Sequence, residues 1–466
     1  MANSGLIVPG ALQLGINPLQ IKPGDMTRCI NVTNDQFGAK KKRPGYTTYL
    51  GTVNGGYVYD LLNFTQNSGT QFWNYRNNNG TLYYSQQGTG AWTLCGNGTF
   101  TAGSHIGVGT LEDTLIAGNG VAATRHTTNG TSFTNTTAAP IASRFVDYQN
   151  RIYAIGTANT MFWSTTGTPT SWTGSDSSSI TIPGPGKLLD IMKVADRVVT
   201  TKNSGVVHRW DGYNLFDLST NLGFTSPYSV GNVEDYRFGL NRLGVFGFGG
   251  NKPEITSNPI EKIIYNDAGE GIIGTTFDNA PGVVHKYEYM VSVGTVTDDL
   301  TDETILNAVP TYDYQANDWM IRTFANRPTA WLSYRDTSGS QQLIFGDSAG
   351  QCYTYGNNAL NDNGSPIEVV MEGIIHGSTL QDKKWSFFRV MFNPGCEAQV
   401  QIAISDTFTK GRKNWVNLGQ AIDGSLDYKF PSGSRGKFLF WKIIESSRNS
   451  RLNFYAIEFD AEVISH

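Results

Sequence analysis

The residues Gly346-Asp347-Ser348-Ala349-Gly350 form a G-x-S-x-G pattern, which is the spacing of the nucleophile elbow in serine hydrolases. In that elbow a buried strand ends in a sharp turn that carries the serine, and a helix follows. Here the β-forming residues 352–355 follow the turn, and Gly356 then breaks the chain. Because strand, polar turn and strand is typical of a β-hairpin, we expect Ser348 to lie at a hairpin tip and to have no catalytic role.

The strongest local charge is a basic run that leads into a Pro-Gly turn. Clusters of lysine and arginine bind nucleic-acid phosphates mainly where a whole domain is basic. This chain of 466 residues has a formal net charge of −4, and the run contains no aromatic residue. We therefore predict an assembly interface, in which the basic side chains steer docking and the turn fixes the path of the chain. Its residues are Lys40, Lys41, Lys42, Arg43, Pro44 and Gly45.

Other constellations of reactive residues give no catalytic, metal or cofactor site. The four cysteines, Cys29, Cys95, Cys352 and Cys396, are far apart and form no C-x-x-C pair, so we expect buried thiols in a reducing compartment. The acidic residues of 298–303 are predicted to lie in one solvated loop, whereas glycosidase acids need two separated positions. The sequence therefore predicts a protein that is not an enzyme and has no cofactor.

The composition favours an all-β fold. The chain has 53 glycines, 12% aromatic residues and only 16% charged residues, and short β-branched or aromatic runs alternate with Gly/Asn turns. The N-terminus has no basic region followed by an apolar one, and no run of 18 apolar residues occurs. We therefore expect neither a signal peptide nor a membrane segment.

A short block recurs along the chain, and its period indicates the architecture. A polar turn leads into an apolar strand at Asn150-Arg151, Asp196-Arg197 and Asn241-Arg242, with spacings of 46 and 45 residues. A period near 45 residues is typical of β-propeller blades of four strands each. Ser348 occupies the same place in its hairpin as Asn159, Ser204 and Gly250 do in theirs. We predict seven blades, with six as the alternative.

Composition divides the chain into three parts. Residues 1–51 are predicted to form an extended N-terminal arm, and residues 52–365 the propeller, with an irregular region around 252–322. Residues 366–466 contain long alternating strands such as "WSFFRVMFN" and "LNFYAIEFDAEV", so we expect a separate antiparallel domain resembling a β-sandwich.

Asn31-Val32 and Arg43-Pro44-Gly45, within "INPLQIKPGDMTRCINVTNDQFGAKKKRPGYTTY", carry a resemblance to a known family. The segment resembles the N-terminal arm of tail hub or nozzle proteins of short-tailed bacteriophages, including proteins similar to tail tubular protein B and to phage stabilisation proteins. "NKPEITSNPIEKII" and "GKFLFWKIIESSRNSRLNFYAIEF" look like pieces of the same proteins. The resemblance implies a structural virion protein without enzymatic activity.

The resemblance also implies the partners. The protein would form a homo-oligomeric ring, usually a hexamer, below the portal and adaptor, and would contact other tail proteins. Genomic DNA would pass through the lumen during ejection without tight binding. The protein would be assembled in the bacterial host cytoplasm and reside in the virion tail.

Two other classes of protein fit the same sequence. One is a glycan-binding or glycan-hydrolysing propeller similar to lectins or sialidases, which would use aromatic residues such as Trp73, Trp92, Trp163, Trp172 and Trp210. The other is a scaffold propeller for protein–protein interaction. A hexamer mass would favour the tail ring, and a monomer with glycan affinity would favour the lectin.

Overall fold

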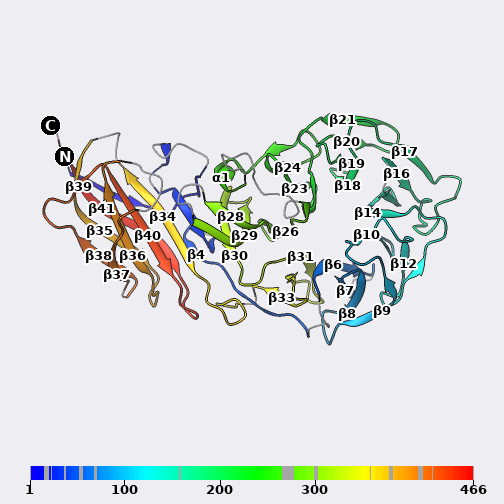
Figure 1. Ribbon diagram of the computed structural model, residues 1–466, viewed down its shortest axis with the longest axis horizontal. Coiled ribbons are helices and arrows are strands. Elements are labelled where there is room, and N and C mark those ends of the chain that lie inside the picture. Colours follow the sequence, from blue (N-terminus) through cyan, green and yellow to red (C-terminus); the bar gives the residue numbers. More distant parts are fainter. Residues whose placement is uncertain are drawn as a thin grey trace.

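The computed structural model shows an almost entirely β protein with a ring of blades at one end and a second β region at the other (Figure 1). It describes residues 2–14, 20–22, 24–35, 38–51, 56–67, 71–156, 159–264, 278–298, 303–356, 358–376, 381–407, 413–421 and 423–464. A short helical segment follows the fifth blade. There a 3-10 turn, Asn258–Ile260, leads into the helix α1, Glu261–Ile264.

The ring consists of four-stranded antiparallel blades, of which five are continuous in sequence. The first two are β6 (Val58–Thr65), β7 (Phe72–Asn78), β8 (Thr81–Gln86) and β9 (Thr93–Thr99), then β10 (Gly107–Leu111), β11 (Thr114–Gly118), β12 (Arg125–Thr127) and β13 (Thr134–Asn135). The third is β14 (Ala142–Tyr148), β15 (Arg151–Gly156), β16 (Thr160–Trp163) and β17 (Ser178–Thr181). The fourth and fifth are β18 (Leu188–Val194), β19 (Arg197–Lys202), β20 (Val207–Trp210) and β21 (Leu215–Ser219), then β22 (Ser226–Val233), β23 (Tyr236–Asn241), β24 (Gly244–Phe248) and β25 (Glu254–Ile255).

The sixth blade is completed by a strand from the other end of the chain. β31 (Ala330–Arg335), β32 (Gln341–Gly346) and β33 (Cys352–Tyr355) are followed by β5 (Tyr46–Thr48), which pairs with β33. Tyr46 is fully buried, and its ring lies 4.9 Å from each of the rings of Phe345 and Tyr353. β31 in turn packs against β6 of the first blade. The ring is therefore held closed by residues that precede it in sequence.

The propeller is confirmed, but it has six blades and not the seven that we favoured. Much of the region expected to be irregular, around 252–322, instead folds into β26 (Gly282–His285), β27 (Glu288–Val291), β29 (Glu303–Asp313) and β30 (Asp318–Thr323). β26 lies between β22 and β31 in the ring. These strands are one end of a ten-stranded sheet, because β30 pairs with β2 (Met26–Ile30) and β2 pairs with β34 (Val369–His376).

Two sheets share a core outside the ring. The ten-stranded sheet continues through β40 (Phe438–Glu445), β36 (Gln399–Ser405) and β37 (Val416–Gln420), and β28 (Gly294–Asp298) pairs with β29. The other sheet contains β1 (Ala2–Ile7), β3 (Val32–Asn34), β4 (Lys40–Lys42), β41 (Asn453–Val463), β35 (Lys383–Phe392), β38 (Ser425–Lys429) and β39 (Arg435–Gly436). Buried side chains of both sheets, including Trp385 of β35 and Trp441 of β40, belong to one hydrophobic cluster.

The residues expected to form an extended arm are divided among these sheets. β1 pairs with β41, β2 lies between β30 and β34, and β5 belongs to the ring. Each strand supplies backbone hydrogen bonds to a sheet whose other strands lie hundreds of residues away. The N-terminal segment is therefore built into both parts of the molecule, and in the ranges that the structure describes it does not form a separate arm.

Candidate functional site

The basic run lies at the point where the ring meets the second β region. Lys40 forms an ion pair with Asp318, and the Lys42 ammonium lies 2.9 Å from Glu445. Lys40, Lys42 and Arg43 are buried, with 2%, 8% and 2% of their surface exposed. The prediction that these side chains face a neighbouring protein is therefore wrong for these three residues, because each is neutralised by an acidic partner of the same chain. Lys41 and Pro44 are half-buried, and an interface role for them stays a prediction.

Arg43 has the most complete set of partners in this region. Its two terminal nitrogens donate to the two carboxylate oxygens of Asp362 at 2.9 and 2.6 Å, and its Nε donates to Asn31 Oδ1 at 2.8 Å. The guanidinium also donates to the carbonyl of Thr323 and lies 4.6 Å from the centre of the Phe324 ring. Such a planar, bidentate arrangement suits arginine and not lysine.

Asn31 connects Arg43 to the ten-stranded sheet. Its side-chain amide donates to Thr323 Oγ1 and to the carbonyl of Glu368, both at 2.7 Å, and its oxygen accepts from the backbone of Thr323 at 2.8 Å. Asn31 has a positive φ of 59°, a conformation that asparagine tolerates better than most residues. We call Asn31, Arg43, Thr323 and Asp362 the Arg43 junction.

Gly45 continues the junction into the ring. Its amide donates to the carbonyl of Ala359 at 2.7 Å, and its carbonyl accepts from Gly356 at 2.9 Å. A Cβ atom at this position would lie 2.0 Å from the carbonyl oxygen of Asn361. Gly45 has no positive φ, so glycine is required here because of this close approach of two backbones.

A second polar cluster links the innermost strands of the ring, and sequence analysis did not find it. His105 Nδ1 lies 2.8 Å from an oxygen of Asp60 on β6, and its ring stacks on Tyr228 of β22 with the centres 3.6 Å apart. The guanidinium of Arg144 on β14 lies 4.4 Å from the centre of the Tyr228 ring and 3.4 Å from Asp190 on β18. We call these five residues the axial cluster. Four of them lie on the innermost strands of the first, third, fourth and fifth blades, and His105 immediately precedes β10 of the second, so these contacts cross the middle of the ring.

β-Bulges aim three of these side chains at the axis. The pairing of the innermost strand with its neighbour shifts between Val58 and Asp60, between Ala142 and Arg144, and between Leu188 and Asp190. A bulge re-aims the side chain that follows it. Arg144 and Asp190 are 46 residues apart, the same spacing as the repeated turns, so the periodicity contained a signal for them.

The polar groups of the axial cluster bond to one another and to neighbouring residues of the chain. Asp60 accepts hydrogen bonds from Asn77 Nδ2 at 2.7 Å and from the amide of Ile106 at 2.8 Å, in addition to its contact with His105. Burial raises the pKa of Asp190 to about 6, although the neighbouring Arg144 acts in the opposite direction. Burial also raises the pKa of Tyr228. The contacts of the axial cluster make it a connection between blades.

Ser348 lies at the exposed tip of the hairpin between β32 and β33, as predicted. The neighbouring Asp347 is buried and accepts hydrogen bonds from the amides of Ala349 and Gln351 at 2.9 and 2.8 Å. Asn159 and Ser204 occupy the equivalent tips in the third and fourth blades. Gly250 does not, because it follows β24 and thus lies one strand later in its blade. The third copy of the repeat was therefore aligned one strand out of register.

The remaining predicted features have mixed outcomes. The four cysteines are buried and unpaired, and burial raises the pKa values of the Cys29, Cys95 and Cys352 thiols to about 12 and of Cys396 to about 11. Residues 299–302 of the acidic loop lie outside the described residues. Among the five tryptophans, Trp73, Trp92 and Trp210 are buried, whereas Trp163 and Trp172 are half-buried.

In the described ranges, no group of three or more His, Cys, Asp or Glu side chains could hold a metal ion. None of the helices in this part of the chain is long and apolar enough to cross a membrane.

Comparisons with known proteins identify propellers. No protein-family model matches the chain, and no curated protein sequence does. YCF48 from Cyanidioschyzon merolae is similar in structure at 10% identity with a TM-score of 0.44, covering 67% of this chain and 98% of its own. The WD40 β-propeller domain of Doa1 is similar at 10% identity with a TM-score of 0.39, covering 67% of this chain and 97% of its own. BBS1N, solved in complex with ARL6DN, is similar at 9% identity with a TM-score of 0.44, covering 68% of this chain and 99% of its own.

Proposed function

We propose that this chain is a structural protein of the virion of a short-tailed phage, which forms the hub or nozzle ring of the tail around the DNA exit channel. The observation that carries the proposal is the connection between the ring and the second β region. One ten-stranded sheet runs from the ring into that region. The Arg43 junction ties β30 of this sheet, through Thr323, to Asp362, which forms a β-bridge with Tyr46 of the ring strand β5.

The junction also gives a structural meaning to the residues that carry the family resemblance. Asn31 and Arg43 are the two matched residues that hydrogen-bond each other directly, at 2.8 Å. The resemblance therefore falls on side chains that hold the fold together. Matches at such residues support an architecture shared with the tail proteins more strongly than matches on exposed loops would.

The axial cluster bears on the path of the DNA. Because His105 stacks on Tyr228 from the opposite side of the ring, a duplex has no passage along the axis of one propeller. In the proposed tail ring, the channel is therefore enclosed between several copies of the chain, and a hexamer is the assembly that the resemblance implies. The proposed partners are the portal, the adaptor and other tail proteins, the place is the virion tail after assembly in the host cytoplasm, and the proposed role is not enzymatic.

The oligomeric state tests this proposal. Light scattering on the purified chain across a range of concentrations should give a mass about six times that of the 51.0 kDa chain. A monomer that binds glycans would contradict the tail ring and favour a lectin.

A further inference from the structure

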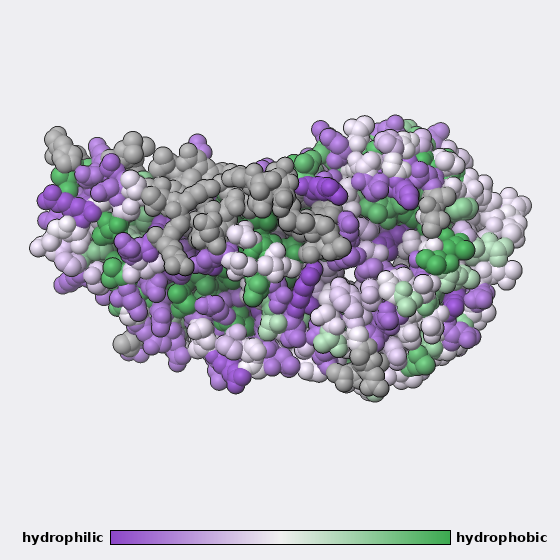
Figure 2. All heavy atoms as spheres, viewed as in Figure 1, coloured by the Kyte–Doolittle hydropathy of each residue, from purple (hydrophilic) through white to green (hydrophobic). Residues whose placement is uncertain are grey.

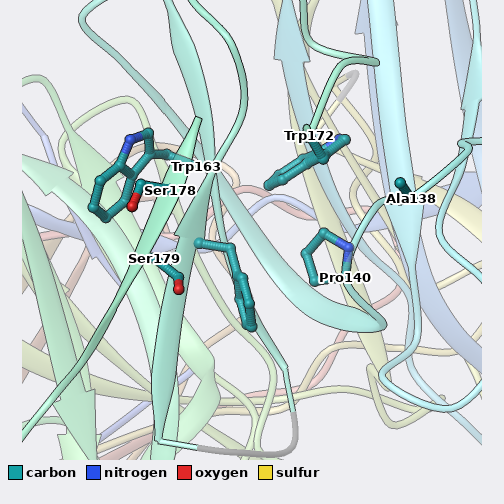
Figure 3. Close-up of a pocket in the computed structure, with 7 residues that line it drawn as sticks. Ala138, Pro140, Trp163, Trp172, Ser178 and Ser179 are labelled. Carbon is teal, nitrogen blue, oxygen red and sulfur yellow. The ribbon is translucent and has the colours of Figure 1, made fainter. Parts of the chain in front are cut away.

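The rim of the third blade carries an aromatic cavity that none of the features above uses. It has a volume of about 290 Å³ and is lined by Ala138, Pro140, Phe162, Trp163, Trp172, Ser178 and Ser179. Figure 3 shows Trp172, Pro140 and Ala138 facing the strand that carries Ser178 and Ser179. On the face of the blade toward Trp172, the lining side chains supply two aromatic rings, one proline ring and one hydroxyl group, and the lining contains no charged side chain.

The aromatic walls are held in place before any ligand arrives. Trp163, on the other face of the blade, stacks on Trp210 of the fourth blade with ring centres 5.8 Å apart, and this anchors the strand β16 that carries Phe162. Trp172 packs against the cluster of the second and third blades that contains Phe145. Its loop is braced by a hydrogen bond of 2.8 Å from the Thr165 amide to the Ser171 carbonyl. Rigid aromatic side chains lose little conformational entropy on binding.

The polar groups lie on the outer strand of the blade. Cross-strand pairing places Ser179 opposite Phe162 and Ser178 opposite Trp163, and both serines are exposed. Partners opposite each other share a face of the sheet, and successive residues of a strand alternate between faces. Ser179 therefore stands beside Phe162 on the face toward Trp172 and Pro140, and Ser178 stands beside Trp163 on the other face, toward the fourth blade. β17 pairs only with β16 in its sheet, so its outer edge is free of other described strands.

We propose that this cavity binds a neutral saccharide. Sugar rings present apolar C–H faces that aromatic rings cover and hydroxyl edges that serine hydroxyl groups bond. The uncharged lining disfavours anionic ligands such as sialylated glycans or nucleic-acid phosphate, which require basic side chains. A volume close to the lower end of ligand pockets, about 300 Å³, suits one or two sugar residues. In a tail protein this site would contact the carbohydrate of a bacterial surface.

The test uses the full-length chain and saturation-transfer NMR with maltotriose, cellotriose, triacetylchitotriose and 3′-sialyllactose. We expect at least one neutral trisaccharide to bind with a Kd of roughly 0.1–10 mM, and sialyllactose to bind at least tenfold more weakly. Ser179→Trp should fill the cavity from an exposed strand position, abolish binding and leave the melting temperature unchanged. Trp172→Ala should weaken binding at least tenfold.

Tyr213→Ala is the matched control, because Tyr213 is the most exposed aromatic residue that the structure describes, at 87%, and is not part of the lining. It should leave sugar binding unchanged. The proposal is overturned if no neutral sugar binds, if Ser179→Trp binds as well as wild type, or if only an extended peptide binds along the free edge of β17. Because binding is measured per chain, these outcomes are independent of the mass that tests the tail ring.

Discussion

At the scale of single residues, Arg43 is the side chain on which the two parts of the molecule most depend. It is 2% exposed and donates to Asp362, Asn31 and Thr323. Removing one member of a buried ion pair leaves an uncompensated charge, which costs about 3–5 kcal/mol. We expect Arg43→Ala to lower the free energy of unfolding in urea by this amount.

The control for this prediction is Arg389→Ala. Arg389 also makes a bidentate pair, with Asp427 at 2.7 Å, but 38% of its side chain is exposed. Its removal should leave the urea midpoint close to that of wild type, because exposed ion pairs are screened by solvent. Equal losses in the two variants would show that Arg43 has no special role.

Gly45 tests whether the junction depends on backbone contact. The nearest atom to a Cβ there is the carbonyl oxygen of Asn361 at 2.0 Å, so Gly45→Ala should reduce soluble folded protein severely. Gly51→Ala is the matched substitution, because Gly51 has no atom within 4 Å of its Cβ position and no positive φ. Circular dichroism of the soluble fraction measures both. A well-folded Gly45→Ala protein would refute this account of the junction.

Asp190 gives the axial cluster a pH dependence with a defined sign. Its pKa is raised from 3.8 to about 6, so between these values the folded state holds more protons than the unfolded state. The contribution of Asp190 to the free energy of unfolding therefore falls as pH rises from about 4 to 6. His285 acts in the opposite direction, because burial lowers its pKa to about 4. A comparison with a variant is needed to separate the two.

Asp190→Asn should thus gain stability relative to wild type as pH rises from 4 to 7. Urea unfolding at several pH values measures this difference. The control Asp196→Asn, at a turn position where the carboxylate is 77% exposed, should give a curve parallel to wild type. A parallel curve for Asp190→Asn would contradict the assigned pKa.

Sequence alone located some of these residues and missed others for physical reasons. It singled out Arg43 and Asn31 but placed the basic run at a surface, because a charge run shows no sign of its acidic partners. Those partners, Asp318, Glu445 and Asp362, lie more than 270 residues away in the chain. The contact between His105 and Tyr228 could not be predicted from the sequence either, because these residues meet only when the ring closes.

At the scale of elements, β5 determines whether the ring is closed. A chain lacking residues 1–48 loses the fourth strand of the sixth blade and the Tyr46 contacts with Phe345 and Tyr353. Loss of one fully buried aromatic side chain alone costs about 3–5 kcal/mol. We expect this truncated chain to aggregate or to unfold without a cooperative transition, as followed by calorimetry.

A chain lacking only residues 1–7 is the control, because it loses the edge strand β1 and keeps the ring. It should unfold cooperatively. If the chain lacking residues 1–48 melts as wild type does, the closing role of β5 is wrong.

The hairpins of the blades could be predicted from the sequence, but the long-range pairing of strands could not. The repeat of about 45 residues predicted the blades because each turn and strand is encoded locally. The strands β26, β27, β29 and β30 form in the region that was expected to be irregular. Their incorporation into a ten-stranded sheet depends on β2 and β34, which pair with them across the whole chain, so no local pattern could indicate it.

At the scale of the whole molecule, exposed hydrophobic residues are spread over the surface in small groups. Figure 2 shows hydrophobic residues in small groups among hydrophilic ones over the ring. Large apolar residues that are exposed include Leu6 at 66%, Val121 at 63% and Leu306 at 64%, and they come from separate parts of the fold. A ring of copies would bury such residues where neighbouring chains meet.

The most direct test of the central proposal is electron microscopy of the purified full-length chain. The proposed tail ring predicts class averages with sixfold symmetry, in which an open channel lies between copies and the axis of each propeller is closed. Particles of one chain at every concentration, or rings whose only openings are the propeller axes, would contradict it.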